Sequence, residues 1–120
     1  MANILIVDDS RTSRKILRGL LESEGHTVVA EATNGQEGYD LYAQHRPNLV
    51  TMDITMPVLN GVESLKKIIA DFPDAKVIMV SAAGQHHNMI EAVQNGAKEF
   101  IAKPFEVNDI KNAINSVLNS

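Results

Sequence analysis

Short runs of apolar residues recur along the chain, and each run stops at a polar residue or a turn. Five such runs are present, at Asn3 to Val7, Val28 to Ala30, Leu49 to Met52, Lys76 to Val80 and Phe100 to Ala102. Continuous apolar runs of this length are typical of strands that are buried on both faces. The pattern therefore predicts five short strands.

Between and after these runs, apolar residues recur at the three- and four-residue spacing of helices. Helix caps and breakers bound each stretch, because Ser10 can cap a helix start, and Gly25, Pro47, Pro73 and Gly96 stand where helices end. The predicted helices run from Ser10 to about Glu24, from Asn34-Gly35 to before Pro47, from Val62 to before Pro73, from about Met89 to before Gly96, and from Val107 to Leu118.

The alternation of five strands with five helices predicts an α/β fold. Short connections between strand and helix favour right-handed crossovers, a parallel sheet and helices on both of its faces. A chain of 120 residues with 44% hydrophobic content can bury one core but not two. We therefore expect one domain over residues 1–120.

Composition excludes several classes of function. The 15 acidic and 11 basic residues give a formal net charge of −4 and no concentrated basic stripe, so direct nucleic-acid binding is not expected. Cysteine is absent, which excludes disulfides and thiolate metal sites. The first apolar run stops at Asp8, too early for a signal peptide or a membrane span, so we expect a cytoplasmic protein.

Polar residues that can do chemistry stand at the carboxyl ends of four predicted strands. Asp8 and Asp9 follow the first strand, Asp53 the third, Ser81 the fourth and Lys103 the fifth. In open parallel sheets, sites form beyond these strand ends. Each residue alone is more often a helix cap or a solvated loop residue. The joint placement of all five residues favours a site.

Three carboxylates at one sheet edge repel one another by about 4 kcal/mol per pair at 4 Å, so they need a cation. Mg²⁺ fits, with Asp9 and Asp53 as direct ligands and Asp8 acting partly through water. Asp53 can then act as a nucleophile that forms an acyl phosphate. Lys103 supplies a second positive charge and the Ser81 hydroxyl a hydrogen bond to the transferring group.

Two further sequence features, the neighbouring histidines and the glycines, do not indicate a function. Neighbouring histidines on a helix point in different directions, so His86 and His87 cannot chelate one metal together. The glycines match neither GxGxxG nor GxxxxGK[ST], so the sequence does not support nucleotide binding.

The ordered set of motifs resembles the bacterial response-regulator receiver domain over essentially the whole chain. The resemblance implies a flavodoxin-like, CheY-like doubly wound (βα)5 fold with strand order 2-1-3-4-5. The matching segments are Ile6-Val7-Asp8-Asp9-Ser10, Met52-Asp53-Ile54-Thr55-Met56-Pro57, Asn60-Gly61, Ser81-Ala82, Gly96-Ala97 and Lys103-Pro104-Phe105.

The resemblance implies a role for each site residue. Asp53 would take a phosphoryl group from the phosphohistidine of a sensor histidine kinase. The backbone carbonyl of Thr55 would join the Mg²⁺ ligands. Ser81 would swing toward the phosphoryl group, and Lys103, in a cis peptide bond with Pro104, would bridge to it.

The family also uses an aromatic residue on the fifth strand that turns inward during the switch, and Phe100 occupies that position. CheY-like members often have Tyr there, so a signal read through a phenolic hydroxyl is absent here. The output surface would comprise the fourth helix, the fifth strand and the fifth helix.

Thr51 to Pro57 and Ser81 to Phe105 are most similar to stand-alone chemotaxis receivers of the CheY type. The resemblance thus implies a monomeric two-component response regulator whose phosphorylation favours binding to a flagellar motor switch protein, with a phosphatase as a further partner. Such a protein catalyses its own phosphorylation and dephosphorylation but is not a multiple-turnover enzyme.

Two alternatives stay open. The chain ends at Ser120, directly after the last predicted helix, which favours a stand-alone protein, yet a receiver of a longer DNA-binding regulator would have the same sequence here. A small Mg²⁺-dependent phosphohydrolase also forms an acyl phosphate. Such hydrolases usually carry a second Asp two residues after the nucleophile, where this chain has Thr55.

Overall fold

The computed structural model describes the backbone of residues 1–120 and every side chain except that of His86. The expectation that His86 and His87 form no joint metal site thus concerns a side chain outside the described residues. Strands and helices alternate throughout the chain, as expected. The elements are β1 (Asn3–Val7), α1 (Arg11–Ser23), β2 (Thr27–Ala32), α2 (Gly35–His45), β3 (Leu49–Asp53), α3 (Gly61–Asp71), β4 (Val77–Ser81), α4 (His86–Gln94), β5 (Glu99–Ala102) and α5 (Val107–Leu118).

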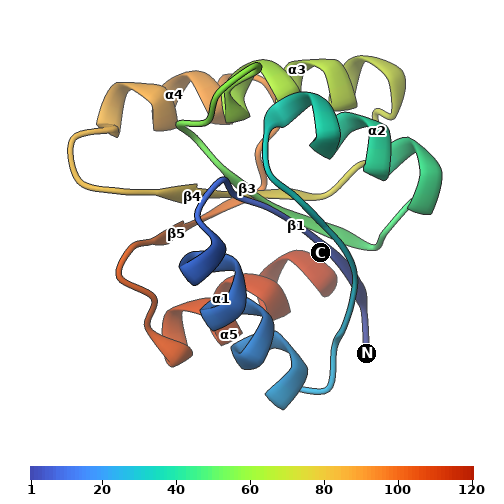
Figure 1. The fold of residues 1–120 in the computed structure, drawn as a ribbon, viewed down its shortest axis with the longest axis vertical. Helices are drawn as coiled ribbons and strands as arrows, with labels where there is room; N and C mark the ends of the chain where they lie inside the picture. The colour runs from blue at the N-terminus through green and yellow to red at the C-terminus, as the bar shows by residue number, and fades with distance from the viewer.

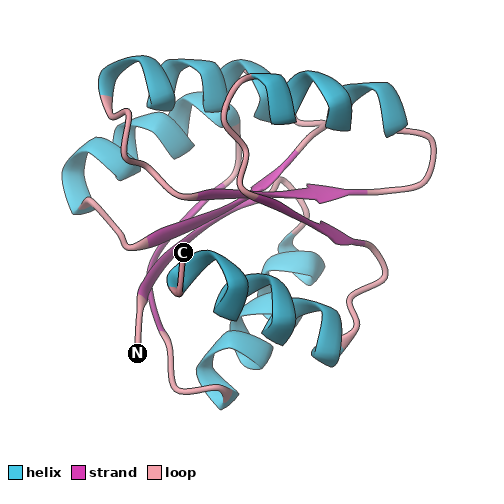
Figure 2. Ribbon diagram, turned by 180° about the vertical axis from the view of Figure 1, so that it is seen from behind, coloured by secondary structure: helices cyan, strands magenta, loops and turns pink.

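The five strands form one parallel sheet in the order β2-β1-β3-β4-β5, which confirms the predicted topology. Helices α2, α3 and α4 cover one face, and α1 and α5 cover the other (Figure 1). The view from behind shows the same three layers, with the sheet between the two groups of helices (Figure 2).

Each face of the sheet has its own hydrophobic core. Leu5 and Val7 of β1 belong to the core beneath α2, α3 and α4, whereas Ile4 and Ile6 belong to the core beneath α1 and α5. Successive side chains of a strand point to opposite faces, so a strand buried on both faces needs apolar residues at every position. This explains the unbroken apolar runs in the sequence.

Side-chain caps fix the starts of three helices. Ser10, Asn34 and Asn60 accept hydrogen bonds from the backbone N–H groups of the third residue of α1, α2 and α3 respectively. These caps satisfy donors that have no partner inside the helix. Helix α4 begins differently, because its N-cap residue Gln85 makes no such bond.

Four strands differ from their predicted limits because pairing sets the strand ends. β2 runs from Thr27 to Ala32, since it pairs with β1 along the whole length of that strand. β4 begins at Val77 and includes Ser81, which pairs with Ala102 of β5. β3 also includes Asp53, and β5 begins at Glu99. Among the described residues, no helix is long and apolar enough to cross a membrane.

Candidate functional site

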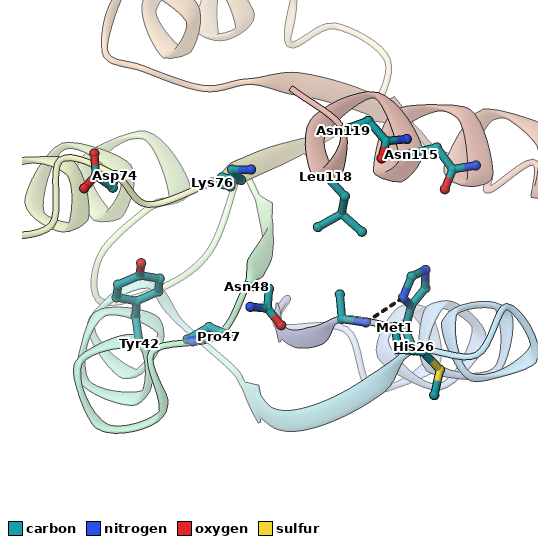
Figure 3. A pocket seen from close by; sticks show the side chains of 11 residues that line it. Met1, His26, Tyr42, Pro47, Asn48, Asp74, Lys76, Asn115, Leu118 and Asn119 are labelled. Atoms are coloured by element: carbon teal, nitrogen blue, oxygen red, sulfur yellow. Dashed lines mark hydrogen bonds between the residues drawn. The ribbon is translucent and has the colours of Figure 1, made fainter.

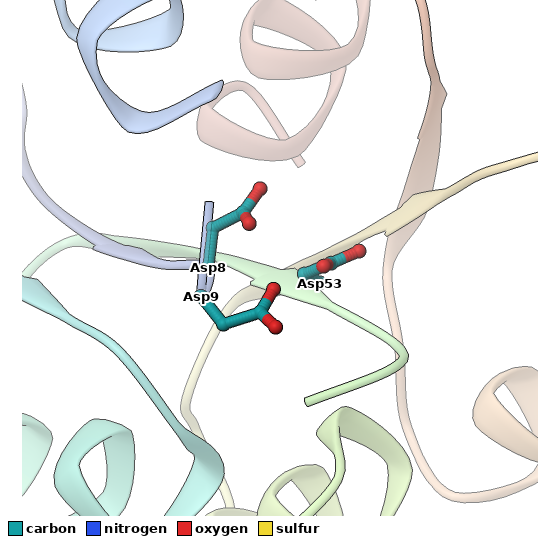
Figure 4. Close-up of side chains that lie close together, drawn as sticks. All are labelled: Asp8, Asp9 and Asp53. Atoms are coloured by element: carbon teal, nitrogen blue, oxygen red, sulfur yellow. The ribbon is translucent and has the colours of Figure 1, made fainter. Parts of the chain in front are cut away.

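Three carboxylates meet at the carboxyl edge of the sheet, where β1 and β3 end side by side. One oxygen each of Asp8, Asp9 and Asp53 lies within 4.8 Å of the others. Figure 4 shows the three side chains close together at the ends of β1 and β3. Asp8 and Asp53 are buried, at 3% and 6% exposure, whereas Asp9 is exposed. The structure thus brings together the three acids that the sequence analysis placed at strand ends.

The loop between β1 and α1 holds Asp8 in place. One Asp8 carboxylate oxygen accepts a hydrogen bond from the Ser10 backbone N–H at 2.8 Å. The Arg14 guanidinium donates to the Asp8 backbone carbonyl at 2.8 Å and pairs with Glu31 of β2 at 3.0 Å. Because α1 and β2 both contribute, the first strand end is tied to two neighbouring elements.

Asp53 is oriented by the turn that follows β3. Its Oδ1 atom accepts a hydrogen bond from the Ile54 backbone N–H at 3.0 Å. The Ile54 carbonyl in turn accepts from the Gly61 N–H at 2.7 Å, which joins the start of α3 to the end of β3. A Cβ atom on Gly61 would lie 1.9 Å from the Asp53 backbone oxygen, so only glycine allows this approach.

Lys103 reaches the acids from the end of β5. Its ammonium Nζ lies 3.0 Å from Oδ2 of Asp8 and 3.7 Å from Oδ2 of Asp53. The Lys103 backbone N–H donates to the Ser81 carbonyl at 2.9 Å, and the Lys103–Pro104 peptide bond is cis. The lysine thus contacts both buried acids, and the contact with Asp8 is the closer of the two.

The charges of the site do not balance by themselves. When ionised, three carboxylates and one ammonium leave a net charge of −2, and two of the acids are buried. Burial and then the neighbouring Asp8 carboxylate raise the pKa of Asp53 to about 6, although Lys103 opposes the shift. A divalent cation would supply the missing charge, and an all-oxygen donor set fits a hard ion of this kind.

The other predicted site residues lie around this cluster. Ser81 is buried at the end of β4, next to the strand that carries Asp53. Thr55 is exposed two residues after Asp53. Phe100 of β5 is half-buried and packs against the core beneath α2, α3 and α4. Phe100 and Ser81 also line a groove of about 460 Å³ beside α5.

A larger hollow of about 600 Å³ opens at the amino ends of the strands, away from the acids (Figure 3). His26 lines it and accepts a hydrogen bond from the Ala2 N–H at 3.2 Å through Nδ1. Burial and the N-terminal ammonium lower the pKa of His26, which favours this neutral acceptor role. The structure therefore gives His26 a role in fixing the N-terminus.

Comparisons with known proteins agree with this architecture. The response regulator receiver domain family matches residues 4–115. The chain belongs to this family. The receiver is 45% identical to the chemotaxis protein CheY of Thermotoga maritima over 114 residues, 95% of each chain. It is 47% identical to CheY of Bacillus subtilis over 116 residues, 97% of each chain.

A solved structure is similar in fold as well as in sequence. The CheY chain in the CheX–CheY–BeF3–Mg²⁺ complex from Borrelia burgdorferi matches with a TM-score of 0.91 and 37% identity, covering 96% of this chain and 87% of that one. The protein is thus a CheY-like receiver, a signalling protein rather than a metabolic enzyme, which excludes the small phosphohydrolase considered from the sequence.

Two residues that the structure places at the site were not predicted from the sequence. Arg14 supports Asp8 from α1, and Gln85 reaches the loop after β3 from the start of α4. The contact of Gln85 with Thr55 joins residues 30 positions apart in the sequence, whereas that of Arg14 with Asp8 spans only six. No local pattern marks either residue, because a helix-face arginine and a loop glutamine are common on surfaces.

Proposed function

We propose that this receiver is a phosphorylation switch in which Asp53 accepts a phosphoryl group from the phosphohistidine of a sensor histidine kinase. The observation that carries the proposal is the placement of the buried Asp53 carboxylate beside Asp8, Asp9 and the Lys103 ammonium. An Asp53 oxygen attacks phosphorus, the P–N bond to the donor imidazole breaks, and that imidazole nitrogen takes up a proton.

Asp9, Asp53 and the Thr55 backbone carbonyl are the proposed Mg²⁺ ligands, with Asp8 assisting partly through water. When bound, the ion neutralises charge on the equatorial oxygens of the transferring group. The charge deficit of the cluster supports this assignment. The presence of Mg²⁺ in the structure of the related Borrelia burgdorferi complex supports it as well.

Two side chains would stabilise the phosphoryl group itself. Lys103 already lies 3.7 Å from an Asp53 oxygen, so a modest movement brings its ammonium to an oxygen of the transferred group. The Ser81 hydroxyl on the neighbouring strand would donate to another oxygen. Phe100 would turn inward as Ser81 moves. With Lys103 and Ser81 stabilising the phosphoryl group, the receiver would catalyse its own phosphorylation and dephosphorylation.

The proposed setting is chemotaxis, in the cytoplasm, as a single monomeric domain over residues 1–120. The two relatives named CheY are matched over 95% and 97% of their own length, which favours a stand-alone receiver over part of a DNA-binding regulator. The output partner would be a flagellar motor switch component that binds α4, β5 and α5, and a phosphatase would reset the switch.

Intact-mass spectrometry with acetyl phosphate tests the proposal. The parent protein should gain one phosphoryl group in the presence of Mg²⁺ and none after the metal is chelated. Asp53→Asn should gain none under either condition, because an amide cannot form the acyl phosphate. Labelling of Asp53→Asn to the level of the parent would contradict the proposal.

A further inference from the structure

The side chain of Gln85 joins the two loops that follow β3 and β4. Its Oε1 atom accepts a hydrogen bond from the Ala82 backbone N–H at 2.7 Å. Its Nε2 atom donates to the Thr55 hydroxyl at 2.5 Å. Both ends of the amide are therefore used, and each end holds a different loop.

These two loops flank Asp53. Asp53 of β3 pairs with Val80 of β4, so the residues beyond this pair leave the sheet side by side at the same edge. Thr55 is two residues beyond Asp53, and Ala82 is two residues beyond Val80. Gln85 thus links the two loops that border the site beyond β3 and β4.

Gln85 also begins α4. Its backbone carbonyl accepts hydrogen bonds from the Asn88 and Met89 N–H groups at 3.1 and 3.3 Å. Its side chain makes no capping bond to the helix. The first turn of α4 is consequently attached to the loops after β3 and β4 through the single residue Gln85. Helices α1, α2 and α3 are instead capped by serine or asparagine side chains.

A phosphoryl group on Asp53 would compete for one of the groups that Gln85 holds. Phosphoryl oxygens are strong hydrogen-bond acceptors, and backbone N–H groups at a loop edge are suitable donors to them. The Ala82 N–H, next to Ser81, is such a donor, and the neutral Gln85 carbonyl occupies it here. A charged acceptor forms the stronger hydrogen bond and should displace the neutral one.

We propose that Gln85 is a positioning residue that holds the receiver in its unphosphorylated arrangement. Its amide occupies the Ala82 N–H and the Thr55 hydroxyl until a phosphoryl group on Asp53 takes over the Ala82 N–H, and its release frees the first turn of α4. Helix α4 carries the exposed apolar residues Ile90 and Val93, so this release changes the presentation of an apolar surface. The inference rests on phosphorylation at Asp53.

Beryllofluoride, which mimics a phosphoryl group on a carboxylate, tests the inference by calorimetric titration in saturating Mg²⁺. Gln85→Ala should bind beryllofluoride about tenfold more tightly than the parent, because removing one competing hydrogen bond changes affinity by about this factor. Mg²⁺ affinity without beryllofluoride should stay the same. Gln94→Ala, an exposed glutamine at the end of α4, is the matched control and should bind like the parent.

A double-mutant cycle with Thr55→Val tests whether the bridge acts as a unit. Thr55→Val removes the hydroxyl that accepts from Gln85 and keeps the backbone carbonyl proposed to bind Mg²⁺. The hydrogen bond between Gln85 and the Ala82 N–H remains, so this variant should tighten beryllofluoride binding by less than Gln85→Ala does. The double variant should bind no more tightly than Gln85→Ala alone. Full additivity of the two substitutions would show that they act separately and would overturn the inference.

Amide hydrogen exchange gives a second readout. In Gln85→Ala without ligand, the Ala82 and Met89 amides should exchange faster than in the parent, since the bridge is gone. Beryllofluoride binding no tighter than in the parent would overturn the role of Gln85 while leaving phosphorylation at Asp53 intact. A parent protein that binds no beryllofluoride would overturn both proposals.

Discussion

Thr51 is a polar residue in the middle of β3, and its hydroxyl is buried. The residue is 1% exposed, and its Oγ1 atom has no hydrogen-bond partner among the side chains and backbone that the structure describes. Its neighbours across the sheet are Ile6 and Ile78, which belong to the core beneath α1 and α5. A buried polar group without a partner lowers the stability of the fold.

Thr51→Val should therefore raise the free energy of unfolding by about 1 kcal/mol, because valine has the same shape without the hydroxyl. Urea unfolding measures this change. Thr51→Ser is the matched control, since it keeps the hydroxyl, loses the methyl group and should be less stable than the parent. A Thr51→Val variant less stable than the parent would indicate that a buried water satisfies the hydroxyl.

Asp53 gives the site a pH dependence in metal-free buffer. Its pKa is about 6 in the folded protein against 3.8 for an unperturbed group, so the folded state holds the proton more tightly than the unfolded state. This contribution to stability is fully present below pH 3.8 and is lost as the pH rises to about 6. Two pKa units correspond to about 3 kcal/mol.

The variant Asp53→Asn should not show this loss of stability with rising pH. Without metal, its free energy of unfolding should exceed that of the parent by about 3 kcal/mol more at pH 7 than at pH 3.5. Paired urea unfolding curves across this range measure the difference. A difference independent of pH would contradict the raised pKa of Asp53.

At the scale of elements, the turn from β3 to α3 sets the position of Asp53. Gly61 begins α3 directly against the backbone of Asp53, and Val58 lies within the turn at a positive φ of 67° while 82% exposed. A β-branched residue rarely adopts this backbone conformation. The turn is therefore held in shape by its surroundings, above all by the contact at Gly61.

Gly61→Ala should disrupt this turn. The new Cβ would meet the Asp53 carbonyl oxygen, so we expect a loss of about 2 kcal/mol or more in stability and a slower reaction with acetyl phosphate. Gly19→Ala is the matched control, because Gly19 lies in α1 with no atom within 4 Å of the added Cβ. That variant should gain about 0.5–1 kcal/mol. Equal stabilities for the two variants would contradict the close approach.

At the scale of the whole molecule, the sequence predicts the fold well because local pattern and topology agree. Apolar runs and capping residues such as Ser10 and Asn60 locate the elements, and right-handed crossovers then bring Asp8 and Asp53 to one edge. Side-chain contacts between segments distant in the sequence could not be predicted from the apolar pattern. The link from Gln85 to Thr55 depends on a loop conformation that no periodic pattern specifies.

The arrangement of the layers explains how one site can act on a distant surface. The acids lie together at the carboxyl edge of the sheet, and Lys103 connects them to β5. β5 continues into α5, and β4 continues through Gln85 into α4. Lys103 and Gln85 therefore link the site to the segments that lead into α5 and α4.

The central claim is that Asp53, and neither of the neighbouring acids, carries the phosphoryl group. Borohydride reduction after treatment with acetyl phosphate and Mg²⁺ tests it directly, because reduction converts a phosphorylated aspartate into homoserine that peptide mass spectrometry can locate. We predict homoserine at position 53 only, and none without Mg²⁺. Homoserine at position 8 or 9, or a phosphoryl group on a serine or histidine, would contradict the account.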